Sequence, residues 1–165
     1  MTIANDNSMA MRASGAIGED STEYVTVIIG DQLFGLPIGR VQDVFMLDRL
    51  TPVPLAPREI AGVLNLRGRI VTALDMRCRL GLPPAENRKA TMAVGTEVRG
   101  ESFGLIIDQV GEVMRLQNSS REPNPVNLDP RWARVSAGVH RLESELIVIL
   151  DVDRVLELAS DPVAA

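Results

Sequence analysis

The sequence predicts a mainly β protein built from two similar small lobes, each a β-barrel or a sandwich. The first observation is an internal repeat, because residues 34–44 recur as residues 103–113 with Phe, Gly, Leu, Ile and two Val in register. A second repeat follows in the same order, since 62–75 matches 138–151 at Gly, Val, two Leu and Asp. Two ordered matches indicate one supersecondary unit used twice. Many short β-rich runs with little helix complete the prediction.

The repeat also predicts the domain organisation. Residues 1–21 are polar, small and aperiodic, which is typical of a disordered tail, and we expect 159–165 to be a flexible tail as well. Between them, residues 22–158 form two interleaved barrel lobes, with repeat halves at 22–84 and 90–158. Two lobes leave a groove between them, which is the first place to expect a binding surface.

The first half begins with strands. A β-branched run at 23–29 predicts a strand, and the alternation of apolar residues at 34–38 predicts a second strand with one buried face. Pro37 lacks a ladder donor, so this strand either ends there or lies at an edge. Apolar residues at 41–45 continue the pattern with helical spacing or a bend, and the proline-rich segment 51–57 is a connector.

A hairpin and a short helix close the first half. The apolar runs 60–66 and 69–74 flank Arg67-Gly68, where Gly68 supplies the positive φ that a tight turn needs. Asp75 is placed to cap a short helix, and Gly81 with the prolines after it ends that helix.

The second half repeats this plan with a longer loop. We expect strands at 91–94, 103–108, 110–116, 135–142 and 146–150, a polar loop at 117–131, and a last helix through Leu158 that Asp151 or Asp153 caps. Trp132, at the end of the loop, anchors either the loop itself or a partner.

Composition excludes several classes of partner. The net charge is −5 and the pI is near 4.9, which argues against nucleic acid or an anionic membrane as the main partner. Aromatic residues make up only 3% of the chain, so base-stacking platforms are not expected either. A single cysteine fits a reducing cytoplasm, and no run approaches the ~18 apolar residues that span a bilayer. We therefore expect a cytoplasmic protein without membrane insertion.

The residues that carry chemistry are few. Cys78 and His140 are the only residues of their types, so they cannot build a multi-ligand metal site of the usual kind. No glycine-rich phosphate loop is present. A Cys–His nucleophile pair stays open as an alternative, because distance in the sequence does not exclude contact. We expect no catalytic residue, no metal and no cofactor.

The motifs 34–44, 62–71 with Leu74-Asp75, 103–110 and 146–152 together resemble the CheW family of chemotaxis coupling proteins. The Asn65-Leu66-Arg67-Gly68 turn with its flanking strands is the most specific of these elements, and the resemblance covers about residues 22–158. It implies a fold of two SH3-like five-stranded β-barrels with short helices.

The resemblance also implies a function. Such adaptors couple the cytoplasmic tips of methyl-accepting chemoreceptors to the regulatory domain of the histidine kinase CheA. Further CheW copies are additional partners, and the arrays reach the membrane through their receptors. The implied receptor-binding residues are Val41, Asp43, Val44 and Arg67, and the implied kinase-binding residues are Leu50, Arg121, Glu122 and Asn127. The alternatives are a coupling protein of a pilus or developmental pathway, or a small-molecule-binding β-barrel.

Arg67 has two interpretations. An arginine at a hairpin tip can fork onto a carboxylate of a partner, or it can be a solvated turn residue. The matching turn of the second copy, residues 143–145, has no arginine, which favours a function because the fold does not require one. Arg69, Arg77 and Arg79 extend it into a basic cluster that is either a solvated face or a surface that steers an acidic partner.

Val41 and Val44 also have two interpretations. Their repeat counterparts are Val110 and Val113, so packing in the core is as good an explanation as an exposed interface. Five glycines are expected to serve backbone geometry: Gly35, Gly62, Gly68, Gly104 and Gly138.

Overall fold

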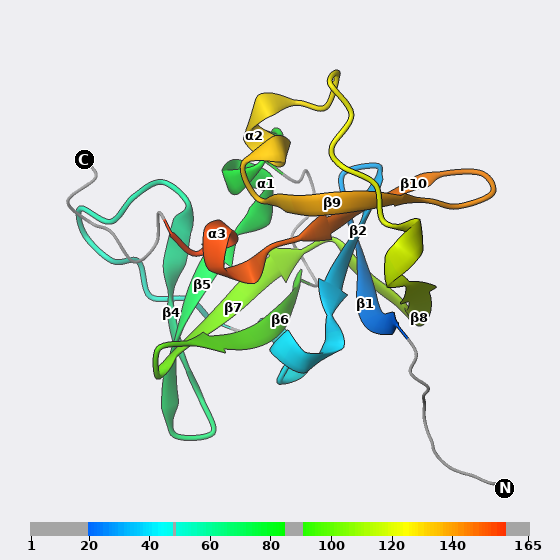
Figure 1. The fold of residues 1–165 in the computed structure, drawn as a ribbon. Helices are drawn as coiled ribbons and strands as arrows, with labels where there is room; N and C mark the ends of the chain where they lie inside the picture. Colours follow the sequence, from blue (N-terminus) through cyan, green and yellow to red (C-terminus); the bar gives the residue numbers. More distant parts are fainter. Residues whose placement is uncertain (1–19, 48, 85–90, 158–165) are drawn as a thin grey trace, which may run out of the picture.

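The protein folds into two curled five-stranded sheets that pack against each other (Figure 1). The computed structural model describes residues 20–47, 49–84 and 91–157. The first sheet has the order β8 (Gln109–Gln117), β1 (Ser21–Ile29), β2 (Gln32–Pro37), β10 (Leu146–Leu150) and β9 (Ser136–Arg141). The second sheet has the order β3 (Asp43–Leu47), β6 (Thr91–Val98), β7 (Glu101–Ile107), β5 (Arg69–Asp75) and β4 (Ile60–Leu66). This architecture confirms the predicted mainly β fold class.

The two sheets are copies of one plan. In the repeat, each strand of β1–β5 corresponds to the strand five positions later in β6–β10. When every strand of the first sheet is replaced by its counterpart, the strand order of the second sheet results. Each sheet takes two consecutive strands from one half of the chain and three from the other half. The two halves meet twice within each sheet. One contact is an antiparallel pair, β1 with β8 in the first sheet and β3 with β6 in the second, and the other is a parallel pair, β2 with β10 in the first and β7 with β5 in the second.

Most of the buried apolar side chains lie between the sheets. This inter-lobe core includes Phe34, Leu74, Leu105 and Leu150, all almost fully buried. Smaller clusters fill the two barrels: Tyr24, Ile147 and Ile149 in the first, and Phe45, Val71 and Ala93 in the second. Because the largest cluster is shared, neither sheet would keep its buried surface if the other were removed.

Three short helices cover the ends of the strands. They are α1 (Met76–Arg79), α2 (Pro130–Ala133) and α3 (Val152–Val155). Asp75 caps α1 by accepting the N–H groups of residues 77 and 78, and Asp151, not Asp153, caps α3 by accepting the N–H of residue 154. No helix in the described part of the chain is long and apolar enough to cross a membrane.

Trp132 anchors the loop before β9 to the core. Its indole Nε1 donates to the Leu80 carbonyl at 3.0 Å, and its ring packs edge-on against Phe34 at a centroid distance of 5.3 Å. The long loop therefore lies against the end of α1, which is the first of the two roles expected for this residue.

Two expectations need correction at their boundaries. The strand does end at Pro37, which is one of the two predicted alternatives, and it is the central strand of its sheet. The predicted strand 34–38 is one residue too long, because Ile38 is 42% exposed in the 3-10 turn η1 (Ile38–Arg40). Ser21, assigned to the N-terminal tail, is already paired with Gln117 as the first residue of β1. The rest of that tail up to residue 19, the helix end at Leu158 and the tail 159–165 lie outside the described residues.

Candidate protein-binding site

The tip of the β4–β5 hairpin presents Arg67 in a fixed conformation. Arg67 and Gly68 have φ values of 53° and 84°, so both are left-handed, as a two-residue type I′ turn requires. The Gly68 N–H donates to the Asn65 side-chain oxygen at 2.9 Å, which secures the turn from inside. A non-glycine residue in this conformation carries a cost of about 1 kcal/mol or more, so the position of Arg67 is determined by its surroundings.

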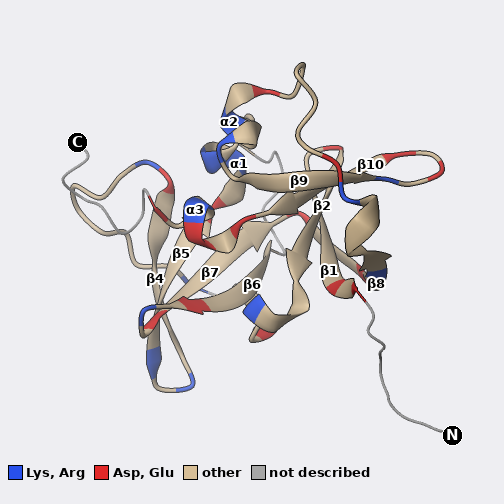
Figure 2. Ribbon diagram, in the orientation of Figure 1, with Lys and Arg blue, Asp and Glu red and all other residues tan. Residues whose placement is uncertain are grey.

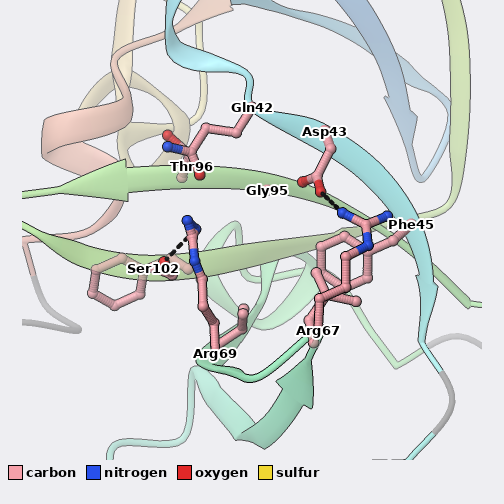
Figure 3. A pocket seen from close by; sticks show the side chains of 11 residues that line it. Gln42, Asp43, Phe45, Arg67, Arg69, Gly95, Thr96 and Ser102 are labelled. Carbon is pink, nitrogen blue, oxygen red and sulfur yellow. Dashed lines mark hydrogen bonds and ion pairs between the residues drawn. The ribbon is translucent and has the colours of Figure 1, made fainter.

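Arg67 pairs with Asp43 across the open side of the second barrel. Asp43 begins β3, and β3 and β4 are the two end strands of this sheet. The Nη1 of Arg67 lies 3.2 Å from Oδ2 of Asp43, and the two side chains are 74% and 33% exposed (Figure 3). The ion pair therefore joins the two edges of the barrel at a place that a partner can reach.

Gly95 makes room for this pair. Gly95 lies in β6 opposite Asp43, and a Cβ atom there would overlap the carboxylate oxygen Oδ1 of Asp43. The sequence analysis did not select Gly95, although a glycine inside a strand is itself a signal that another group approaches closely.

The ion pair stands beside a cavity of about 460 Å³ that belongs to one barrel. Its lining includes apolar Phe45, Val71 and Phe103, and on the polar side Arg69, whose Nη1 lies 3.4 Å from the Ser102 hydroxyl. Figure 3 shows Phe45, Arg69 and Ser102 around the space between β3 and the hairpin. The predicted groove between the lobes is thus not where Asp43 and Arg67 meet, because every lining residue lies in or next to the second sheet.

The two valines lie elsewhere. Val44 follows Asp43 in β3, so its side chain points to the opposite face of the strand, where it is 38% exposed. Met46 shares that face and is 54% exposed, and sequence analysis missed it. We call Val44 and Met46 the apolar strip. Val41 is half-buried and packs against the inter-lobe core, in line with the packing interpretation.

The residues implied to bind the kinase are distributed over both lobes. Leu50 lies against Gly62 of β4 in the second sheet, and Arg121 lies against Gly138 of β9 in the first. These two places are equivalent under the repeat. The residues therefore mark two similar surfaces, one on each barrel.

Glu122 and Asn127 belong to the first of these barrels. Glu122 forms a bridge to Val139 of β9, and its carboxylate accepts from the Nε of Arg141 at 2.9 Å. Asn127 is exposed in the turn that precedes α2. Glu122 thus has a local partner already, whereas Asn127 faces solvent.

The five selected glycines lie where side chains do not fit or where the backbone is left-handed. Side-chain carbons of other strands in the same sheet come within 3.1 Å of where a Cβ would be at both Gly35 and Gly104. At Gly62 and Gly138 a main-chain carbonyl oxygen of a crossing segment lies 2.7 Å and 2.8 Å from that point. Gly68 is in the tight turn described above.

The predicted basic cluster is divided by the fold. Arg67 and Arg69 lie at the tip of the β4–β5 hairpin, while Arg77 and Arg79 lie in α1 beyond the other end of β5. Arg77 forks onto Asp108, with Nε and Nη2 at 3.0 and 2.7 Å from the two carboxylate oxygens. That hydrogen-bonded carboxylate raises the pKa of Arg77.

Cys78 and His140 have different surroundings. Burial raises the pKa of the Cys78 thiol, and the charges of Glu59 and Asp75 raise it further. His140 is only 2% exposed inside the first barrel, with its ring 6.0 Å from that of Tyr24, and burial lowers its pKa. A thiol with a raised pKa is a poor nucleophile. Within the described residues, no group of three or more His, Cys, Asp or Glu could hold a metal ion.

An exposed ion pair, an open barrel mouth and an apolar strip are features of a protein that binds other proteins. The comparison with known families agrees, because the model of the CheW-like domain matches residues 23–160. The chain belongs to this family of chemotaxis coupling and scaffold proteins, whose members are non-catalytic.

Individual relatives show the same relationship. The chain is 28% identical over 133 residues to the chemotaxis protein CheW of Rhizobium meliloti, covering 81% of this chain and 86% of that protein. The crystal structure of the scaffolding protein TtCheW from Thermoanaerobacter tengcongensis superposes with a TM-score of 0.70 at 29% identity, covering 78% of this chain and 88% of that one. Protein PilI of Pseudomonas aeruginosa is 32% identical over 112 residues, covering 68% and 61%. The solved relative confirms two SH3-like subdomains.

Proposed function

We propose that this protein couples the cytoplasmic tip of a methyl-accepting chemoreceptor to the regulatory domain of a CheA-type histidine kinase within signalling arrays. Membership of the CheW-like family supports this role. The observation that carries it is the Asp43–Arg67 pair, which holds an exposed guanidinium at the mouth of the second barrel.

The receptor would contact the second barrel along β3 and the hairpin tip. Within the described residues only Nη1 of Arg67 is engaged, so Nε and Nη2 are available to a carboxylate of the receptor. The apolar strip, Val44 and Met46, would pack against the apolar side of the same receptor helix. Val41 supports this surface from below rather than touching the partner, since it packs on the core.

The kinase regulatory domain would dock on the equivalent surfaces that carry Leu50 in one lobe and Arg121 with Asn127 in the other. A chain with two similar surfaces can hold two similar partners, such as a kinase domain and a second copy of this protein. Arrays need this kind of bivalency, because one contact per subunit would give only isolated pairs.

The similarity to PilI supports a second candidate, which is the same coupling role in a pilus-associated pathway. A third candidate is a β-barrel that binds a small molecule in the cavity of about 460 Å³. Co-purification from cells distinguishes the candidates, because the receptor and kinase recovered with the protein identify the pathway, and recovery of neither favours the third.

Titration of this protein into fixed receptor and kinase tests the bridging role. Phosphotransfer should rise and then fall, because excess adaptor occupies receptor and kinase separately and breaks the ternary complex. The chain without receptor should leave the kinase rate unchanged at every concentration. A rise to a plateau that persists well beyond saturation of both partners would argue against simple bridging.

A further inference from the structure

A second cavity, distant from the ion-paired mouth, is unusually rich in arginine for an acidic protein. Its volume is about 410 Å³, and it opens between α1 of the first half and α2 of the second. Among the described residues, its charged lining consists of four cations and two anions: Arg58, Arg79, Arg131, Arg134, Glu59 and Asp75. The protein carries a net charge of −5, so this local excess of positive charge runs against its overall balance. Figure 2 shows the basic segments of α1 and α2 next to each other.

Arg79 is the buried member of this group. It is only 8% exposed, and its guanidinium donates from Nε to the Val155 carbonyl and from Nη2 to the Arg154 carbonyl, both at 3.1 Å. Neutral carbonyls hold the group in place but do not balance its charge, and a buried cation without a paired anion is costly. Burial accordingly lowers the pKa of Arg79. The charge of Arg134 lowers this pKa further, while the charges of Glu59 and Glu157 raise it.

Two further arginines of the lining are exposed at its entrance. The guanidinium groups of Arg58 and Arg134 form no hydrogen bond or ion pair with any described residue, whereas that of Arg131 pairs with Asp129 at 3.2 Å. One of the two acids is committed elsewhere, because Asp75 caps α1. Three arginines without an ion pair to a described residue therefore line one cavity, together with Glu59.

We propose that this cavity, the arginine pocket, binds a phosphate-monoester group. Guanidinium forks match the oxygens of a phosphate in pairs. Arg131 is already paired with Asp129, so the other three arginines exceed the two lining carboxylates by one positive charge, which a phosphate group would offset. Arg79 supplies the rigid, desolvated donor, while Arg58 and Arg134 close on the anion from solvent. The remaining volume takes the organic part of the ligand. The site is independent of the proposed receptor contact, because β5 runs from Arg69 near the barrel mouth to Asp75 at the arginine pocket.

Two-dimensional amide NMR tests the proposal with glycerol 2-phosphate as the monoester, inorganic phosphate as the free ion and succinate as a dicarboxylate of similar charge. All titrations are run at constant ionic strength. We expect saturable shifts at Gly81, Leu82 and Arg131 with the monoester, weaker ones with inorganic phosphate, and the weakest with succinate. The double variant Arg58→Ala, Arg134→Ala should weaken binding of the monoester by about 10-fold or more, because it removes two charge-assisted contacts.

The double variant Arg49→Ala, Arg115→Ala is the matched control, since it removes the same charge from exposed positions outside the cavity. It should bind the monoester as the wild type does. Shifts that stay linear in ligand, an equal loss in both double variants, or tighter binding of succinate would each overturn the proposal. Arg58 and Arg134 are exposed, so both variants should keep the wild-type thermal transition, which confirms that binding and not folding is measured.

Discussion

The two barrels share one strand order but differ at their mouths. In the second barrel Gly95 leaves a space that the Asp43 carboxylate occupies, and from there the carboxylate pairs with Arg67. The repeat counterpart of Gly95 in the first barrel is Thr26, which is 2% exposed and donates its hydroxyl to the Glu112 carbonyl at 2.6 Å. The same place in one fold thus holds either a closed backbone contact or an exposed ion pair. The repeat supplies the scaffold, and the substitutions supply the site.

The hairpins of the two barrels also differ, in the length of their turns. The second barrel turns in two residues, Arg67 and Gly68, whereas the first turns through the four residues 142–145. The first barrel has an exposed pair too, between Arg141 and Glu122, but it lies along the strand and not across the open edges. A comparison of the barrels therefore separates the features that both keep, which folding requires, from the ion pair across the open edges, which only the second barrel has and which we propose for binding.

The largest effect should come from a feature that the barrels share. Gly62→Ala and Gly138→Ala place a Cβ at φ values of 152° and 134°, against a carbonyl oxygen 2.7 and 2.8 Å away. We expect each to lower the free energy of unfolding by about 3 kcal/mol, from backbone strain and the displacement of a crossing strand. Urea denaturation of both variants measures it.

Gly100→Ala is the control, because Gly100 has a φ of 82° but open space around it. Only strain is left there, so the loss should be about 1 kcal/mol. A loss at Gly62 or Gly138 no larger than at Gly100 would show that the crossing segments adapt and that the barrels do not share this constraint.

The second prediction concerns an interior residue that differs between the barrels. His140 is buried in the first barrel with its Nε2 unpaired among the described residues, and its counterpart in the second is Leu64. Burial lowers the pKa of His140, Arg121 lowers it further and Glu122 raises it. Below pH ~6.5 the unfolded chain binds a proton that the folded chain resists, so stability should fall as pH falls from 7 to 5.5.

His140→Leu makes the barrels alike at this position. It should remove the contribution of His140 to the change in unfolding free energy with pH, which is at most about 1.4 kcal/mol per pH unit. At pH 7.5 the variant should be more stable than the wild type by roughly 1 kcal/mol, since an unpaired buried nitrogen is lost. Chemical denaturation at several pH values measures both quantities. Identical slopes in wild type and variant would mean that other groups control the pH dependence.

The sequence predicted the features that the two barrels share better than the features in which they differ. Strand positions, the hairpin and the caps at Asp75 and Asp151 were recoverable, because they depend on local pattern and on a repeat that doubles each signal. The ion pair was half recoverable: Asp43 and Arg67 were selected, but their contact depends on the curl of the sheet and on Gly95. The separation of Val44 from Asp43 also required the strand register, which a one-residue shift reverses.

The third prediction concerns the ion pair at the mouth of the second barrel, which the first barrel lacks. Arg67→Glu should weaken binding to a receptor-tip fragment by about 10-fold or more, because the charge that would meet the receptor carboxylate is reversed. The free energy of unfolding should change by less than about 1 kcal/mol, since exposed ion pairs contribute little. Gly95→Ala tests the same pair without a charge change, because it displaces the Asp43 carboxylate. Sedimentation with receptor and thermal unfolding measure the two effects.

Arg141→Glu is the matched control, because it reverses an exposed arginine of similar exposure in the first barrel, 64% against 74%. It should bind the receptor fragment as the wild type does. Equal losses of binding in both charge reversals would indicate a general electrostatic effect, and parallel losses of binding and stability would mark Arg67 as structural.

The smallest effect should come from the N-terminal segment. A chain that begins at Asp20 keeps the Asp20 carbonyl that accepts from the Asn118 N–H at 2.7 Å, and the Thr22 hydroxyl that donates to the Asn118 side chain at 2.7 Å. Its free energy of unfolding should stay within about 0.5 kcal/mol of the full chain, and receptor and kinase should sediment with it equally, because the removed residues lack apolar periodicity. A chain that begins at Tyr24 also loses the first strand pairs of β1 with β8, and should be less stable by about 1–2 kcal/mol. The β1–β8 ladder of the first sheet involves Ser21–Ile28 of β1, whereas the corresponding β6–β3 ladder of the second sheet involves only Thr91–Gly95 of β6. The two truncations therefore measure how much stability the longer ladder contributes. Loss of binding in the Asp20 chain with unchanged thermal unfolding would show that the removed residues contact a partner.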